Sequence, residues 1–185
     1  RIQRGQTDAR QAGYPSRAPC VIFSGSCSEM TNRQVNAYKG KAPHFELSVE
    51  KCINQKSYSD EVCKWVADNL DSEHAPMVYA TTDSHRLKAI QQQYGAERSS
   101  HGIEQLFSLL AGKLQAIGVR NFIVAGGETS GVVVQSLNVD GFHIGPQIAP
   151  GVPWVKTLNG ELSLALKSGN FGDESFFIRA QENLS

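Results

Sequence analysis

The sequence has no excess of charge of either sign. Its 185 residues include 18 lysines and arginines and 18 aspartates and glutamates, so the formal net charge is zero. A domain that binds nucleic acid through the phosphate backbone usually carries a surplus of basic residues. The balanced charge therefore argues against a nucleic acid partner.

Long apolar runs are missing as well. No stretch approaches the roughly 20 apolar residues that a membrane-spanning helix needs, and residues 1–6 do not resemble a signal peptide. We therefore expect no membrane partner and a cytoplasmic location. The chain also starts without methionine, so we expect it to be part of a longer protein.

Cysteine and histidine show none of the spacings that metal sites require. The four cysteines, Cys20, Cys27, Cys52 and Cys63, form no C-x-x-C pair and fit neither a zinc site nor a compact disulfide framework. We expect them to be reduced thiols. The five histidines show no metal-ligand spacing either, so we expect no metal held by protein ligands alone.

Two well-known phosphate fingerprints, G-x-x-x-x-G-K-[ST] and G-x-G-x-x-G, are absent. Three other glycine-rich segments occur instead, at residues 126–131, 145–154 and 167–172. The first follows an apolar run, residues 121–125. A strand, a glycine turn and a helix in this order commonly bind an anion, because glycine lets the backbone approach and the helix N-terminus supplies free N–H groups. Such turns also serve simply as connections, so a nucleotide is the leading ligand rather than an established one.

The remaining sequence alternates between short apolar runs and amphipathic segments. Residues 1–18 are polar and are predicted to be a linker or arm, and residues 19–185 a single nucleotide-binding domain. We expect strands at 19–25, 44–47, 76–82, 121–125, 142–144 and 162–166, and helices at 31–38, 59–70, 100–117, from the glycine turn to 137, and at 176–184. The capping-box spacing of Thr31 and Gln34 predicts one helix start, and Ser59 and either Asp173 or Ser175 predict two more.

This alternation predicts the α/β class, with a largely parallel central sheet and helices on both faces. Ligands of such sheets bind at the carboxyl ends of the strands. Residues 24–26, 126–131 and 167–172 all fall at expected strand ends. We therefore expect these three segments to converge on one anion site.

Four segments of the sequence carry a family resemblance. Segments 23–28, 125–131, 144–154 and 165–172 read FSGSCS, AGGETSG, IGPQIAPGVPW and ALKSGNFG. Together they closely resemble the C-terminal, nucleotide-binding domain of the four-carbon acid sugar kinases, which include the 3-oxo-tetronate 4-kinases. The resemblance covers about residues 19–180. One departure is Gln147 and Ala149, where the family usually shows an acidic residue in one or both positions.

The resemblance implies an ATP-dependent kinase that uses Mg²⁺ and transfers the γ-phosphate to the 4-hydroxyl of a tetronate or 3-oxo-tetronate. It also implies a missing N-terminal domain that binds the sugar acid and carries an Asp-Asp motif. ATP or ADP would bind this chain directly, and a homodimer is compatible with the sequence. The alternative function is a non-catalytic regulatory module that binds a nucleotide or another anion.

The expected nucleotide contacts come from the three converging segments: Ser24, Gly126, Gly127, Glu128, Thr129 and Gly169. The amides of Gly126 and Gly127 and the hydroxyls of Thr129 and Ser130 would bind phosphate. Glu128 would hold Mg²⁺ through water, or it is merely an acidic residue favoured in a first helical turn. Gly169 would pack against the ribose or base.

Other residues leave their alternatives open. Lys167 either reaches phosphate as a point charge or is a solvated lysine at a strand end. Asp83 could face the cleft. Pro150, Pro153 and Trp154 are predicted to form a rigid loop that shapes the site. No residue is a convincing general base, so the catalytic residues stay unassigned.

Overall fold

The structure is a computed structural model that describes residues 12–184. Seven strands form one sheet in the order β2-β3-β1-β4-β7-β6-β5. Their bounds are Cys20–Ser24 (β1), His44–Glu46 (β2), Met77–Tyr79 (β3), Asn121–Ala125 (β4), Phe142–Ala149 (β5), Val152–Thr157 (β6) and Ser163–Lys167 (β7).

The five strands from β2 to β7 in this order are parallel, and β6 runs antiparallel to both of its neighbours, β7 and β5. The chain passes from β3 on one side of β1 to β4 on the other side, so the strand order switches direction at β1 and β4. Crevices that bind ligands in open α/β sheets form at such switch points, outside the carboxyl ends of the strands. The topology therefore marks the ends of β1 and β4 as the place to look for a site.

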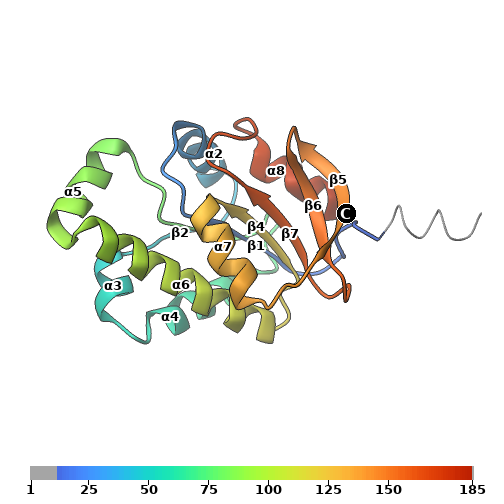
Figure 1. The fold of residues 1–185 in the computed structure, drawn as a ribbon, viewed down its shortest axis with the longest axis horizontal. Helices are drawn as coiled ribbons and strands as arrows, with labels where there is room; N and C mark the ends of the chain where they lie inside the picture. Colours follow the sequence, from blue (N-terminus) through green and yellow to red (C-terminus); the bar gives the residue numbers. More distant parts are fainter. Residues whose placement is uncertain (1–11, 185) are drawn as a thin grey trace, which may run out of the picture.

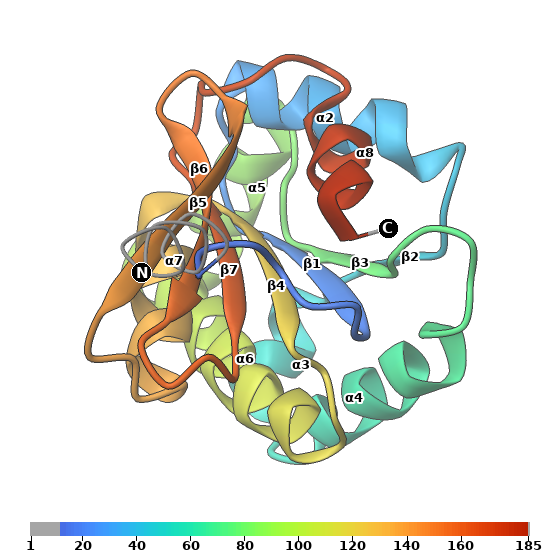
Figure 2. The ribbon, with the colours of Figure 1, turned by 90° about the vertical axis from the view of Figure 1, so that its right-hand side faces the viewer.

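Helices cover both faces of the sheet (Figures 1 and 2). Their bounds are Glu29–Lys39 (α2), Val49–Asn54 (α3), Tyr58–Asn69 (α4), Ser84–Tyr94 (α5), Ala96–Ala116 (α6), Gly127–Ser136 (α7) and Phe176–Gln181 (α8), followed by a 3₁₀ turn, Glu182–Leu184. In Figure 2, α2 and α8 lie together on one side of the sheet and α4 and α6 on the other.

Alternating strand residues fill the two cores. Val21 and Phe23 of β1 pack against residues of α4, α6 and α7, whereas Cys20 and Ile22 pack against α2 and α8. Successive side chains of a strand point to opposite faces, so nearly continuous apolar strands are what a sheet covered on both faces requires. The predicted α/β class, with its largely parallel sheet and helices on both faces, is confirmed.

The start of α2 differs from the prediction. The N-cap is Ser28, whose Oγ accepts a hydrogen bond from the Thr31 backbone N at 3.2 Å. Thr31 and Gln34 do not form a capping box. They are instead buried on the inner face of the helix, where both bond to the loop that follows β7.

Four other helices depart from the sequence pattern. Helix α4 starts at Tyr58 after Ser57, so Ser59 lies inside the helix rather than at its cap. Helix α6 starts at Ala96, earlier than the expected residue 100. Helices α3 and α5 were not predicted, because neither contains a buried residue.

The prediction of a rigid loop around Pro150, Pro153 and Trp154 is wrong. Pro150 lies in the turn of a β-hairpin, and Pro153 and Trp154 belong to its second strand, β6. Register shifts in the hairpin between Ile144 and Ala149 accommodate the prolines, which are tolerated at sheet edges and bulges. Trp154 is fully buried and donates from Nε1 to Ala180 O at 2.9 Å.

Part of the predicted arm can be placed. Residues 1–11 lie outside the described residues, whereas Ser16 and Ala18 each accept a hydrogen bond at 2.9 Å from the Asn121 side-chain amide. The domain boundary at residue 18 stays a prediction. All four cysteines are unpaired. Within residues 12–184, no helix combines the length and the apolar character needed to cross a membrane.

Candidate functional site

A cavity of about 450 Å³ lies at the carboxyl edge of the sheet, over the ends of β1, β3 and β4. One wall consists of loop and turn residues after the strands, and the other of side chains from α3, α5 and α6. The lining residues are Gly25, Ser26, Cys27, Ala80, Thr82 and Gly126–Thr129 on the first wall, and Val49, Leu87, Ile90, Gln91, Ala96, Ser99, Ser100, Ile103 and Glu104 on the second.

Backbone hydrogen bonds tie the three predicted glycine segments together. The amides of Gly25 and Ser26 donate to Ala125 O at 2.9 and 3.2 Å, and the Gly126 amide donates to Lys167 O at 2.8 Å. The turns after β1, β4 and β7 are therefore adjacent. The predicted convergence of these segments at one edge of the sheet is confirmed.

Two of the glycines are required by close packing and a third is not. A Cβ atom on Gly25 would lie 2.0 Å from Thr129 Oγ1. Gly126 has φ of +123°, which side chains rarely adopt, and its Cβ would lie 3.1 Å from the Ser26 amide N. Gly127, by contrast, is exposed, and a Cβ there would meet open space. Packing and backbone conformation therefore require glycine at positions 25 and 126, but they do not explain why position 127 is glycine.

The N-terminus of α7 opens onto the cavity. Its N-cap is Gly126, which offers no side chain to bond the first amides, and the first intrahelical bond runs from Ser130 N to Gly126 O. The N–H groups of Gly127, Glu128 and Thr129 are thus left for another acceptor. These residues line the cavity, so the turn presents free donors and the positive end of a helix dipole to an anion.

The opposite wall was not predicted. Helices α5 and α6 contribute Leu87, Ile90 and Ile103, and α3 adds Val49. These aliphatic side chains give the cavity that the glycine turns line an apolar surface. A signal for α5 exists in the spacing of Leu87, Ile90 and Tyr94, which are three and four residues apart as on one helix face. Asp83 is the N-cap of that helix.

The charge of the cavity wall is negative. Glu104 and Glu128 line it, and none of its described lining residues is lysine or arginine. Residues 12–184 contain no cluster of three or more histidine, cysteine, aspartate or glutamate side chains that could hold a metal ion by themselves. Any cation in this cavity would therefore share its ligands with a bound molecule and water.

Four of the six predicted contact residues, Gly126–Thr129, lie together at the cavity. The other two do not line it. Ser24 is fully buried and its hydroxyl lies 2.6 Å from that of Thr81. Gly169 lies behind Ser26, whose Oγ would be 3.1 Å from a Cβ on this glycine. Direct contact of Ser24 and Gly169 with a ligand stays a prediction.

Three further candidates are placed away from the cavity. Ser130 does not line it, and its buried hydroxyl has no hydrogen-bond partner among the described residues. Asp83 is exposed and accepts the Arg86 amide at 2.9 Å, a bond that lowers the pKa of its carboxyl. Lys167 is fully buried, so the interpretation as a solvated lysine is wrong.

A sequence model of the nucleotide-binding C-terminal domain family matches residues 21–177. Among curated proteins, the chain is 58% identical over 177 residues to a Haemophilus influenzae protein named 3-oxo-tetronate kinase, covering 96% of this chain. It is 56% identical over 182 residues to a Salmonella typhimurium protein of the same name, covering 97% of this chain. In both relatives the match spans 43% of the longer protein.

Solved structures agree with the fold. The crystal structure of a Haemophilus influenzae protein superposes with a TM-score of 0.91 at 56% identity, covering 93% of this chain and 42% of that protein. A Bordetella bronchiseptica structure with only 16% identity has a TM-score of 0.69 and shows the fold alone. The chain thus spans less than half the length of the proteins it matches.

Proposed function

Because this chain belongs to the family of nucleotide-binding C-terminal domains, we propose that it is the ATP-binding part of a four-carbon acid sugar kinase. The kinase would transfer the γ-phosphate of ATP to the 4-hydroxyl of a tetronate or 3-oxo-tetronate. The observation that carries this proposal is the cavity at the carboxyl edge, where the uncapped N-terminus of α7 faces an apolar wall. A nucleotide has the same two parts, an anionic chain and an apolar base.

The phosphate end of the cavity is the turn from Gly126 to Thr129. Three first-turn amides are free to donate, and the Thr129 hydroxyl makes no hydrogen bond to another described residue. Ser26 adds a further donor, since its Oγ accepts from the Ser28 amide at 3.2 Å and leaves its own hydrogen available. Because Gly127 has no side chain, phosphate oxygens can approach the backbone there.

The base end is the wall of α5 and α6. Leu87, Ile90 and Ile103 offer aliphatic surface to a planar ring, and Gln91 and Ser100 add polar groups beside it. Pockets of this kind, apolar with a few polar groups, are typical of sites for small ligands. The base would gain affinity by burying apolar surface there.

Mg²⁺ fits this donor set as a companion of the triphosphate. The lining residues include two carboxylates and no cationic side chain, so a nucleotide without a cation would meet like charge. Glu128 and Glu104 are oxygen donors of the type that Mg²⁺ prefers, and Mg²⁺ usually binds through few carboxylates together with substrate phosphates. Bound there, the ion would neutralise charge on the transferred group.

The sugar acid and the general base are assigned to a part of the kinase outside this chain. Exposed Asp83 caps a helix, and Glu128 and Glu104 are proposed to serve the cation. We therefore propose that the acceptor binds to an N-terminal domain, and that the two domains meet at the carboxyl edge. A cytoplasmic location and a homodimer belong to the same proposal, and light scattering would test the latter.

The test has two arms. Calorimetric titration of this chain with ADP, ATP and inorganic phosphate, with and without Mg²⁺, should show nucleotide binding below millimolar ligand, strengthened for ATP by Mg²⁺. An ADP-release assay over a panel of tetronates should show turnover only after the N-terminal domain is added, because positioning of both substrates can lower a barrier by about 7 to 11 kcal/mol. Nucleotide binding without turnover in the presence of both domains would favour the regulatory module instead.

A further inference from the structure

Lys167, the last residue of β7, is fully buried, and its ammonium has no carboxylate partner among residues 12–184. The Nζ atom lies 2.6 Å from Gly169 O, 3.1 Å from Ser168 O and 3.1 Å from Thr31 Oγ1. An ammonium has three N–H donors, and these three neutral oxygens use all of them. A buried charge without a counter-ion is costly, so its presence needs an explanation that packing does not supply.

Two of the three oxygens, Thr31 Oγ1 and Gly169 O, belong to a series of hydrogen bonds that reaches the cavity. Thr31 Oγ1 donates to Gly169 O at 2.8 Å and accepts from Ser28 Oγ at 2.9 Å. The Ser28 amide in turn donates to Ser26 Oγ at 3.2 Å, and Ser26 lines the cavity. The main chain of Lys167 also accepts the Gly126 amide. The ammonium therefore lies behind the turns that form the phosphate end.

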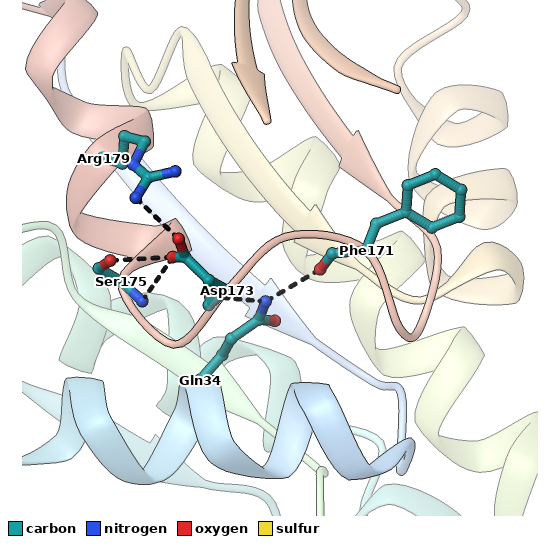
Figure 3. Close-up of polar contacts among 5 residues, drawn as sticks. All are labelled: Gln34, Phe171, Asp173, Ser175 and Arg179. Carbon is teal, nitrogen blue, oxygen red and sulfur yellow. Dashed lines mark hydrogen bonds and ion pairs between the residues drawn. The ribbon is translucent and has the colours of Figure 1, made fainter. Parts of the chain in front are cut away.

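The loop after Lys167 is held by other residues too (Figure 3). The Gln34 side-chain amide donates to Phe171 O at 3.0 Å and to Asp173 O at 2.9 Å. The Asp173 carboxylate accepts from Ser175 and from Arg179, the latter at 2.8 Å. Helices α2 and α8 thus fix the far part of the loop without the lysine, so the charge of Lys167 is not needed merely to order it.

We propose that Lys167 is a positioning residue for the nucleotide phosphates, a buried positive charge that acts through Thr31 and the Gly169 loop without touching the ligand. This inference rests on the proposed function. The cavity wall carries two carboxylates and no cation, so the ammonium behind the turns offsets their repulsion of phosphate. Direct contact is excluded by geometry, since every N–H of the ammonium already has an acceptor.

The charge of Lys167 should also couple binding to pH. Burial, with no charged neighbour contributing, lowers the pKa of Lys167 to about 8. Phosphate favours the charged form, so nucleotide affinity should fall as the pH rises above that value. The neighbouring charged groups are the pairs Glu29–Arg33 and Asp173–Arg179 and the carboxylates Glu104 and Glu128. Burial raises the pKa of the Cys27 thiol.

The experiment compares ADP and adenosine binding by calorimetry for the wild type and Lys167→Met at pH 7, 8 and 9. At pH 7 the variant should bind ADP about tenfold more weakly and adenosine less than about twofold more weakly. The ADP affinity of the wild type should fall several-fold from pH 7 to 9, whereas the ADP affinity of the variant should change little over this pH range.

Three variants serve as controls. Lys156→Met makes the same change on the neighbouring strand β6, where Lys156 pairs with Ser163 at the opposite end of β7, and should bind ADP like the wild type. Thr31→Val removes the hydroxyl that accepts from the ammonium and donates to Gly169 O, and it should weaken ADP binding, whereas Thr31→Ser should bind ADP like the wild type.

The outcomes separate this inference from the proposed function. If the wild type binds ADP and Lys167→Met binds it equally well at every pH, Lys167 has no positioning role although the nucleotide site stands. An equal loss for ADP and adenosine would mean that the lysine only supports the fold, which also overturns the inference. If the wild type binds no nucleotide, the proposed function and the inference fail together.

Discussion

The two ends of the cavity differ in which atoms form them: main-chain atoms at one end and side chains at the other. The phosphate end consists of backbone, with glycine at 25, 126 and 127 and free amides at the start of α7. The base end is formed by side chains of α5 and α6, with aliphatic Leu87, Ile90 and Ile103 beside polar Gln91 and Ser100. Backbone recognition requires glycine at fixed places, so it leaves a trace in the sequence. Recognition by aliphatic side chains leaves almost no recognisable sequence pattern, because the same residue types fill the core of any protein.

The largest effect should come from placing a side chain at the phosphate end where the fold has room for one. Gly127→Val should weaken ADP binding by about a hundredfold, because the new side chain would block phosphate from the backbone amides, each a donor to a charged group worth about 1.5 to 3 kcal/mol. The melting temperature should hardly change, since a Cβ at this position meets open space. Calorimetry and thermal unfolding measure the two quantities.

Gly131→Val is the matched control for that variant. Gly131 lies four residues later in α7, is exposed, and also has open space around a Cβ, but it does not line the cavity. It should bind ADP like the wild type. Equal ADP affinity in Gly127→Val and Gly131→Val would show that the turn is not the phosphate site.

A smaller loss should follow from removing the one side-chain hydroxyl that α7 presents to the cavity. Thr129→Val keeps the shape that packs against Gly25 and should cost about 1 to 3 kcal/mol of ADP affinity, the range for a charged acceptor deprived of a donor. Adenosine binding should be unchanged, and Thr129→Ser should bind ADP normally. A matching loss for adenosine would reduce Thr129 to a packing residue.

A substitution at the base end should affect adenosine and ADP alike, unlike the substitutions at the phosphate end, which should affect ADP alone. Ile90→Ala should weaken adenosine and ADP by the same factor, about tenfold or less, because it removes part of the apolar surface that covers the base. Gln92→Ala, two residues on and outside the cavity lining, is the control. A loss confined to ADP would contradict the division of the cavity into two ends.

The last expected effect is on stability rather than on binding. The pKa of Lys167 is lowered from 10.5 to about 8 in the folded chain, so between these values the unfolded chain binds a proton that the folded chain has released. Stability of the wild type should therefore rise with pH in this window relative to Lys167→Met, by at most about 1.4 kcal/mol per pH unit. Urea unfolding of both proteins at pH 7.5, 8.5 and 9.5 measures this difference in stability. The same pH dependence in the wild type and in Lys167→Met would contradict a lowered pKa of the buried lysine.

The same contrast explains what the sequence could and could not predict. The strands at residues 19–25 and 121–125 and the turn at Gly126 were predictable, because apolar runs that end in glycine have few other interpretations. Helix α5 leaves only the short apolar spacing of Leu87, Ile90 and Tyr94, because none of its residues is buried and the helix covers a cavity rather than filling a core. The hairpin of β5 and β6 was obscured by its prolines, which the register shifts accommodate.

Lys167 shows a second limit of sequence reading. A lysine after an apolar strand is equally consistent with solvent and with burial, and its burial depends on Thr31, which lies 136 positions away in the chain. The helix carrying Thr31 was predicted, but the side of that helix that faces the loop after β7 was not. Long-range hydrogen bonds between polar side chains and backbone carbonyls have no local pattern from which they could be inferred.

The most direct test of the central claim is an amide chemical-shift titration of the ¹⁵N-labelled chain with ADP and with adenosine. Both ligands should shift the amides of Leu87, Ile90 and Ile103 at the base end. Only ADP should produce large shifts at Gly127, Glu128 and Thr129, whose free N–H groups would bond its phosphates. If ADP and adenosine give the same chemical shifts for these three amides, the nucleotide phosphates do not bind at the start of α7 and the account is wrong.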